Sequence, residues 1–314
     1  MNLDLYTSVV ETNCAFFCRF ESKASAIINL TDIKISRPGL WFPTIWIYLV
    51  PFTLSIKFWE EPIFWIGLFF VTFPLNYLVY GLNDCNDIAS DQVNDRKGNF
   101  LFGAKASRSY LDKIPRKVAY VVLPFILYFT YHSGLMMLGL LAFMILVNIA
   151  YNFPPLRIKE RPPFEILIQV GYVTTVFFSV LLNGLDMIPW QTILYLCLFA
   201  FQAHVAGEIM DIEPDLLSKK NTTATRIGRK KTKYLMISLL VIEVYILFYW
   251  FQDYFLVGFL GVFAIWMLLD VFLVFKEKPY TLSQMKLFGL AMNVSAFGTM
   301  AWVLYSGKLL NPVI

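Results

Sequence analysis

Charged residues are scarce in this sequence. Asp, Glu, Lys and Arg make up 15% of its 314 residues, whereas a soluble domain averages about 25%. Cysteine is also rare: there are four, and only Cys14 and Cys18 are closely spaced, with no second ligand pair nearby. A zinc cluster or a framework of disulfides is therefore not expected, and we interpret the cysteines as free thiols.

Apolar residues are abundant instead, at 58% of the chain, and the mean hydropathy is +0.61. Aromatic residues reach 18%, and such rings suit lipid-facing surfaces, interfacial belts and apolar cavities. Membrane helices of about 20 residues each would use most of the chain and leave no room for a separate soluble domain. We therefore expect one membrane domain, and no nucleic acid as a partner.

Long apolar runs separated by polar loops predict an all-α integral membrane bundle of nine transmembrane helices. Each run is near the length of about 20 residues that crosses the hydrocarbon core. Very short loops, such as 131–134 and 252–253, require antiparallel hairpins. The predicted spans are residues 38–56, 62–83, 117–132, 134–153, 164–183, 190–210, 233–250, 254–275 and 284–304.

Basic residues are distributed unevenly between the two sides of this predicted bundle. Of the 26 Lys and Arg residues, only Lys57 and Lys308 fall in loops on one side. Cytoplasmic loops carry an excess of Lys and Arg, so we expect the N-terminus and the loops after the even-numbered spans to be cytoplasmic. Residues 1–36 lack the continuous apolar stretch of a signal peptide and are interpreted as a cytoplasmic amphipathic segment, followed by a transmembrane domain over residues 37–314.

Two acidic motifs follow the second and sixth predicted spans. The first runs from Asn83 to Asp91, and its carboxylates would share one face if the helix continues that far. The second repeats the same i, i+3, i+7 spacing at the cytoplasmic end of another span, so the chain resembles a loose two-part repeat. The carboxylates are Asp84, Asp87 and Asp91 in the first motif, and Glu208, Asp211 and Asp215 in the second.

Stacked carboxylates repel one another, and burial near a membrane increases the cost, so a cation must compensate them. Clusters of oxygen ligands alone suit Mg²⁺, which completes its shell with water and phosphate oxygens. We therefore predict that the two motifs hold Mg²⁺ ions bridging a diphosphate. The metals and nearby Lys or Arg would stabilise the diphosphate as it leaves, and aromatic faces would stabilise the carbocation that remains.

A few polar residues lie within the predicted spans. His204 precedes the second motif by seven residues. We expect it to have a packing role through a hydrogen bond, and a place facing the cavity is the alternative. Asp270 falls near the cytoplasmic end of its span, where an interfacial role is expected. Glu243 lies deeper, where interhelical hydrogen bonding and a place on a cavity wall are both open.

The motifs resemble those of the UbiA superfamily of membrane prenyltransferases. Residues 83–91 read N-D-x-x-D-x-x-x-D, like the first signature of that family, and residues 211–215 read D-x-x-x-D, like the second. Residues 151–159 resemble its cytoplasmic Y-S-x-P-P-x-R-x-K loop, with Asn152 in place of Ser. The resemblance implies a nine-helix fold and Mg²⁺-dependent chemistry on an isoprenyl diphosphate.

The resemblance also implies roles for individual residues. Metal-binding and catalytic roles fall on Asp84, Asp87, Asp91, Asp211 and Asp215. Binding of the diphosphate substrate falls on Asn83, Tyr151, Arg157 and Lys159.

The expected reaction is transfer of an isoprenyl group to a hydrophobic acceptor that enters from the membrane lipids. A terpene cyclase using the same diphosphate site, an aromatic prenyltransferase acting on a quinone precursor, and a transporter with an inverted repeat are the alternatives. The segment D-I-E-P-D at 211–215, followed by T-T-A-T at 222–225, resembles the lycopene elongase branch, which favours a carotenoid acceptor. Five side chains of the fifth span would line a groove for it: Tyr172, Thr174, Thr175, Phe177 and Phe178.

Overall fold

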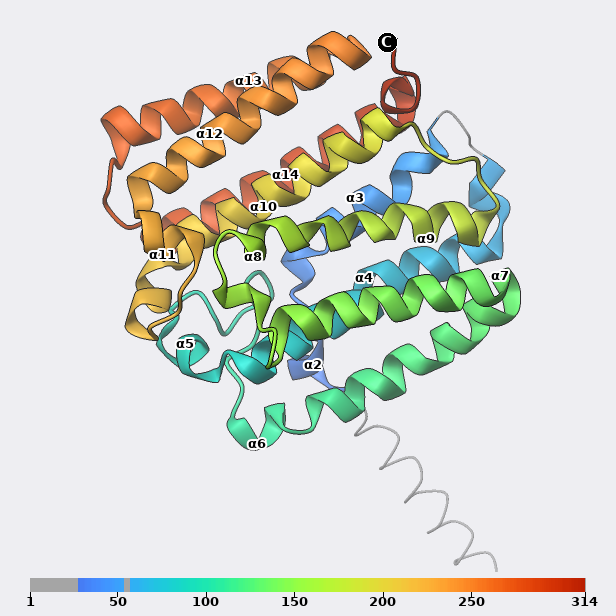
Figure 1. Ribbon diagram of the computed structural model, residues 1–314, viewed down its shortest axis with the longest axis horizontal. Coiled ribbons are helices and arrows are strands. Elements are labelled where there is room, and N and C mark those ends of the chain that lie inside the picture. The colour runs from blue at the N-terminus through green and yellow to red at the C-terminus, as the bar shows by residue number, and fades with distance from the viewer. Residues whose placement is uncertain (1–27, 54–56, 314) are drawn as a thin grey trace, which may run out of the picture.

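Long helices run side by side through the molecule and place their connecting loops at two opposite ends (Figure 1). The structure, a computed structural model, describes residues 28–53 and 57–313, and no β-strand occurs in these ranges. The predicted N-terminal segment is thus described only from residue 28 onward, and Cys14 and Cys18 lie outside the described residues. Cys85 and Cys197 are free thiols, as predicted.

Seven helical segments of the described chain are long and apolar enough to cross a bilayer. They are α4 (Pro62–Asn86), α6 with α7 (Arg108–Leu111 and Ile114–Asn152), α8 to α9 (Phe164–Leu167 and Thr174–Asn183), α10 (Trp190–Leu217), α12 (Arg229–Ile246), α13 (Tyr254–Leu269) and α14 (Leu282–Ser306). The all-α membrane bundle predicted from the sequence is confirmed.

Helix α7 accounts for two of the predicted spans. Gly134 interrupts it with φ 79° and ψ −170°, a conformation that only glycine adopts readily. The chain reverses there and the second half of α7 returns beside the first (Figure 1). The hairpin predicted at residues 131–134 is therefore present.

The first predicted span, residues 38–56, is shorter and more broken than expected. Its helical part consists of η1 (Pro38–Leu40), α3 (Phe42–Leu49) and η2 (Val50–Phe52), with only residues 42–52 forming an apolar helix. Pro38, Pro43 and Pro51 cannot donate a backbone hydrogen bond, so they divide the segment into short pieces. The total of nine membrane crossings stays a prediction.

Two apolar clusters form the core. One gathers buried side chains of α4 and both halves of α7, such as Phe70, Phe129 and Met137. The other gathers side chains of α10, α12 and α13, such as Leu196, Leu240 and Leu260. Helices α3 and α9 contribute to both clusters, so the two halves of the bundle pack across them and leave a cavity between α4 and α10.

Short helices gather at the end of the bundle where both acidic motifs lie. These are α2 (Leu30–Ile35), α5 (Ile88–Val93), α6, α8 and α11 (Thr223–Ile227) (Figure 1). Asp32 of α2 anchors this end because it accepts hydrogen bonds from Tyr77 at 2.7 Å and Lys117 at 2.8 Å. Helix α2 is thereby tied to α4 and α7.

Candidate active site

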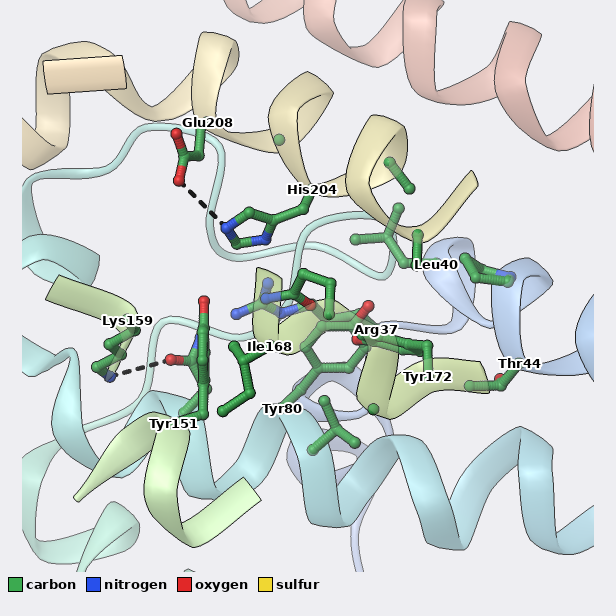
Figure 2. A pocket seen from close by; sticks show the side chains of 18 of the residues that line it. Arg37, Leu40, Thr44, Tyr80, Tyr151, Lys159, Ile168, Tyr172, His204 and Glu208 are labelled. Carbon is green, nitrogen blue, oxygen red and sulfur yellow. Dashed lines mark hydrogen bonds and ion pairs between the residues drawn. The ribbon is translucent and has the colours of Figure 1, made fainter. Parts of the chain in front are cut away.

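A cavity of about 310 Å³ lies between α4, α7 and α10 (Figure 2). One end is charged: it is lined by Asp87, Asp211 and Asp215 and by Arg37, Arg96, Lys97, Lys159 and Lys220. The remainder is lined by apolar and aromatic side chains, among them Leu75, Val79, Tyr80, Met144, Tyr151, Tyr172 and Phe199. The cavity therefore joins an ion-pair network to an apolar interior.

The first acidic motif is divided by a break in the helix. Helix α4 ends at Asn86, Asp87 has φ −110° and ψ 17°, and α5 begins at Ile88. The expectation of one continuous helical face is therefore wrong for this motif. Asp84 and Asp91 both contact Lys97, at 2.7 and 2.9 Å, whereas Asp87 faces other cations.

Asp87 lies between two lysines that come from distant parts of the chain. Its carboxylate contacts Lys159 Nζ at 2.5 Å and Lys220 Nζ at 2.9 Å. Burial alone would raise the pKa of Asp87, but the two lysine charges outweigh it and hold that pKa well below its usual range. Lys159 also donates to Asn83 at 3.1 Å, so Asn83, Asp87 and Lys159 form one group on the cavity wall.

Asp84 is more deeply buried than the other carboxylates and does not line the cavity. Its Oδ1 atom accepts from Arg37 at 2.8 Å and from Lys97 at 2.7 Å. Its Oδ2 atom is buried and has no hydrogen-bond partner among the described residues. Burial raises the pKa of the neighbouring Asp91 to about 6, and Asp84 adds to this rise.

The second acidic motif lies within the last turns of α10, which extends to Leu217, seven residues beyond the predicted span. Asp211 forms an ion pair with Arg96 and accepts a hydrogen bond from Asn94 at 2.9 Å. Asp215 lies 3.6 Å from Lys220. Because Arg96 and Asn94 follow the first motif, and Lys220 reaches back to Asp87, the two motifs are joined across the cavity.

Residues 151–159, at the end of α7 and in the loop that follows, were predicted to bind the substrate, but not all of them reach the cavity. Tyr151 and Lys159 line the cavity. Arg157 does not: its guanidinium donates to Glu160 at 2.7 Å and to the backbone oxygen of Asn86 at 3.4 Å. The structure thus brings Tyr151 and Lys159 together with both motifs and leaves Arg157 beside the end of α4.

Several residues at the charged end were not predicted as site residues. They are Arg37, Asn94, Arg96, Lys97 and Lys220. A sequence signal existed for three of them, since Arg96-Lys97 and Lys219-Lys220 each follow an acidic motif closely. Arg37 gave no such signal because it precedes the first predicted span, and Asn94 gave none because it is an ordinary loop residue.

The donor set fits Mg²⁺. The carboxylates supply only oxygen atoms, and the free Oδ2 of Asp84 shows that the network has an unused acceptor. No three His, Cys, Asp or Glu side chains of the described residues converge around one point. Mg²⁺ takes few protein ligands and fills its shell with water and phosphate oxygens. The metal roles of the five aspartates stay predictions.

The family model of the UbiA prenyltransferases matches residues 40–296 of this sequence. The chain belongs to the UbiA prenyltransferase family. The segment matched contains both acidic motifs and all the cavity-lining residues except Arg37. This UbiA protein is therefore a multi-pass membrane enzyme of the prenyltransferase class. The transporter considered above is thereby excluded.

Curated relatives of this UbiA prenyltransferase include two enzymes named lycopene elongase/hydratase. The protein of Corynebacterium glutamicum is 27% identical over 198 residues, which cover 62% of this chain and 68% of the relative. The protein of Haloarcula japonica is also 27% identical, over 211 residues that cover 64% of this chain and 68% of the relative.

Solved structures with the same fold include a UbiA homologue from Archaeoglobus fulgidus. Its structures bound to DMAPP and Mg²⁺ and to GPP and Mg²⁺ each align with a TM-score of 0.60 and cover 86% of this chain and 99% of that one. The sequence identities are 15% and 14%, so the comparison establishes the fold.

Proposed function

We propose that this UbiA enzyme transfers a short, five-carbon allylic group from its diphosphate to the end of a carotenoid, with Mg²⁺ as cofactor. The observation that carries the proposal is the cavity, which joins a charged end to an apolar, aromatic interior. A diphosphate needs the charged end, and an allylic chain beside the end of a polyene needs the apolar, aromatic interior.

The charged end is suited to a metal-bound diphosphate. Five aspartates and five Lys or Arg side chains form ion pairs there, so their charges nearly balance. Mg²⁺ bound by the aspartates would supply the positive charge that stabilises the leaving diphosphate. Lys159, Lys220 and Arg37 border the same space and would hold phosphate oxygens in place. Burial and the nearby carboxylates act oppositely on the pKa of Lys220 and leave it raised, so this side chain stays cationic.

The apolar end supports a hydrophobic acceptor. Tyr80, Tyr151 and Tyr172 present rings to the cavity (Figure 2), and aromatic faces stabilise an allylic cation. Of the groove residues predicted on the fifth span, Tyr172, Thr174 and Thr175 line the cavity. Phe178 is fully buried in the core cluster instead, and Phe177 packs against the other cluster.

The residues that resemble the lycopene elongase branch shape one wall of the site. Thr222 lines the cavity and, with Thr225, forms a capping box at the start of α11. Glu213 of the D-I-E-P-D segment forms an ion pair with Arg229 of α12. These contacts hold α11 and α12 against α10, so Glu213 and Thr225 support the wall of the cavity that Asp211, Asp215 and Thr222 line. Together with the names of the curated relatives, they favour a carotenoid acceptor.

The test is product analysis with the purified enzyme. Allylic diphosphates of five, ten and fifteen carbons are each offered with lycopene or with a hydroxybenzoate, with Mg²⁺ or with EDTA, and pyrophosphate and organic products are measured. We expect Mg²⁺-dependent pyrophosphate release and a lycopene extended by five-carbon units. A prenylated aromatic beside unchanged lycopene, or a cyclic terpene formed from the donor alone, would contradict the proposed acceptor.

A further inference from the structure

His204 is the one histidine that faces the cavity. The chain has two histidines, and the other, His132, is exposed at the hairpin turn of α7, where it contacts Ser133. His204 projects from α10 into the cavity and its ring lies edge-on to that of Tyr151, with 6.3 Å between the ring centres. Of the two places that the sequence left open for His204, the structure shows the one that faces the cavity.

A buried carboxylate orients the imidazole. His204 Nε2 lies 3.1 Å from Glu208 Oε1, one helical turn further along α10 (Figure 2). Both atoms are buried, and among the described residues neither makes a regular hydrogen bond, so this close contact is the polar interaction that each of them has. A carboxylate beside one ring nitrogen favours the proton on that nitrogen, which leaves Nδ1 as the basic atom.

Glu208 is itself held in place from the opposite side. Its Oε2 atom accepts a hydrogen bond of 3.0 Å from the backbone N–H of Ala224 at the start of α11. The neighbouring Thr223 N–H donates to Glu165 at 2.6 Å. The T-T-A-T segment therefore fixes the carboxylate that faces His204, which connects this segment to the cavity chemistry.

His204 also lies at a suitable depth. It precedes Asp211 by two turns of α10, which is about 10 Å of helix rise. If the diphosphate of the donor binds at the charged network, its allylic carbon would lie between Asp211 and His204, beside the tyrosine rings.

Other groups around the cavity are poorly placed to accept a proton from carbon. Asp87, Asp211 and Asp215 each contact a lysine or arginine side chain and belong to the motifs proposed to bind Mg²⁺. Tyrosine hydroxyl groups are weak acids rather than bases. These assignments leave the imidazole of His204 as the base on this wall.

We propose that His204 is the general base of the reaction and that Glu208 positions it. This inference rests on the proposed function. The C–O bond of the donor breaks and pyrophosphate leaves with the electron pair. The π electrons of the acceptor double bond then form the new C–C bond, which leaves a cation on the acceptor. Nδ1 of His204 takes the proton from the adjacent carbon, whose C–H electrons form the new double bond.

The decisive measurement is the ratio of coupled olefin to released pyrophosphate, because it reports what happens to the cation after the donor has ionised. His204→Gln keeps the size of the side chain and a hydrogen-bonding group toward Glu208 but has no basic nitrogen. We expect pyrophosphate release to stay within about threefold of wild type, while the coupled olefin falls about 100-fold, in the range that a general base contributes. Alcohols from capture of the cation by water should replace it.

Two further variants separate catalysis from structure. His132→Gln, at the exposed hairpin, should leave yield and product ratio unchanged. Glu208→Gln retains an oxygen for Ala224 and should lower the ratio of olefin to pyrophosphate without lowering the unfolding temperature by more than His132→Gln does.

Three results would overturn the assignment. One is an unchanged ratio of olefin to pyrophosphate in His204→Gln. A second is a parallel loss of both, which would indicate a role in donor binding. The third applies if the wild-type enzyme prenylates an aromatic ring, so that the proposed carotenoid acceptor is wrong. The ring must still lose a proton, and an unchanged ratio of prenylated aromatic to pyrophosphate in His204→Gln would exclude His204 as the base. A lowered ratio in that variant would support the role of His204 although the proposed acceptor is wrong.

Discussion

Asp87 and Asp211 occupy equivalent places in the two motifs but have different surroundings. The side chain of Asp87 is 7% exposed and contacts two lysines, of which Lys159 is 4% exposed. The side chain of Asp211 is 29% exposed and contacts Arg96 and Asn94. Removing the charge of Asp87 leaves two lysines without this buried partner, whereas removing the charge of Asp211 leaves one arginine without a partner that was itself partly exposed to water.

Asp211→Asn should therefore abolish turnover with little loss of stability. A metal ligand contributes several kcal/mol of charge stabilisation in the transition state, so pyrophosphate release should fall by at least about 100-fold. Asp186→Asn, at an exposed loop position on the other side of the bundle, serves as the control. Near-normal Mg²⁺-dependent release in Asp211→Asn would contradict the proposed site.

Asp87→Asn should lose both activity and stability. Breaking a buried ion pair by removing one partner costs about 3–5 kcal/mol, so the unfolding temperature in detergent should drop clearly below that of Asp211→Asn. The double variant Asp87→Asn/Lys159→Met also removes one of the unpaired lysine charges, so its unfolding temperature should be higher than that of Asp87→Asn. Equal unfolding temperatures for the two Asn variants would mean that the network around Asp87 is weaker than its contacts indicate.

At the scale of elements, α7 depends on one backbone conformation. A Cβ at Gly134 would meet no atom within 4 Å, so only the backbone conformation opposes a side chain there. Gly134→Ala should lower stability by about 1–3 kcal/mol. Gly139→Ala, five residues further along the same helix and equally free of contacts, should instead raise it by about 0.5–1 kcal/mol. Thermal unfolding checks the pair, and a shift of the same sign in both would contradict the turn conformation.

A buried ion pair links α12 to the end of α13. Lys233 Nζ lies 2.7 Å from Asp270 Oδ2, and both side chains are almost fully buried. Lys233 also donates to the backbone oxygen of Lys276 at 2.8 Å, and Tyr280 donates to Asp270. Asp270 thus joins the ends of two helices to the following loop, and the interfacial role expected for it stays a prediction.

Lys233→Met should destabilise the protein by about 3–5 kcal/mol because it leaves Asp270 buried and unpaired. The double variant Lys233→Met/Asp270→Leu should be more stable than this single variant, since it removes both desolvated charges. Lys230→Met, at an exposed position of the same helix, should have little effect. A double variant less stable than Lys233→Met would show that the pair contributes net stability.

At the scale of the whole molecule, the acidic motifs share one end of the bundle and the turn at Gln252 lies at the other. Lys308 near the C-terminus donates to the backbone oxygen of Gln252 at 2.5 Å, so it belongs to that opposite end. The skewed distribution of Lys and Arg predicts that the motif end is cytoplasmic.

Reporter fusions test this orientation. A reporter fused after Gly98, in the loop that follows the first motif, should behave as cytoplasmic, and one fused after Leu310 should behave as external. Matching behaviour of the two fusions would mean that the predicted number of spans is wrong by one.

Patterns local in the sequence predicted most of the fold. Apolar runs of about 20 residues appear as helices because lipid offers the backbone no hydrogen-bond partners, and a helix satisfies its own N–H and C=O groups. Exceptions occur where a local feature interrupts the helix, as at the prolines of residues 38–51 and at Asp87, where α4 has ended at Asn86, five residues before the end of the first motif. The predicted spans also placed the two acidic motifs at the same end of the bundle, where the structure shows them.

The sequence by itself determined the class of this protein: a membrane bundle with two acidic motifs of the UbiA type. The tertiary structure decided which groups meet in the cavity. Lys159 and Asp87 are 72 residues apart, and Asn94 and Asp211 are 117 residues apart. The physical reason is that spacing along a helix reports only which side chains share a face, whereas a charge takes its partner from whichever helix end packs against it.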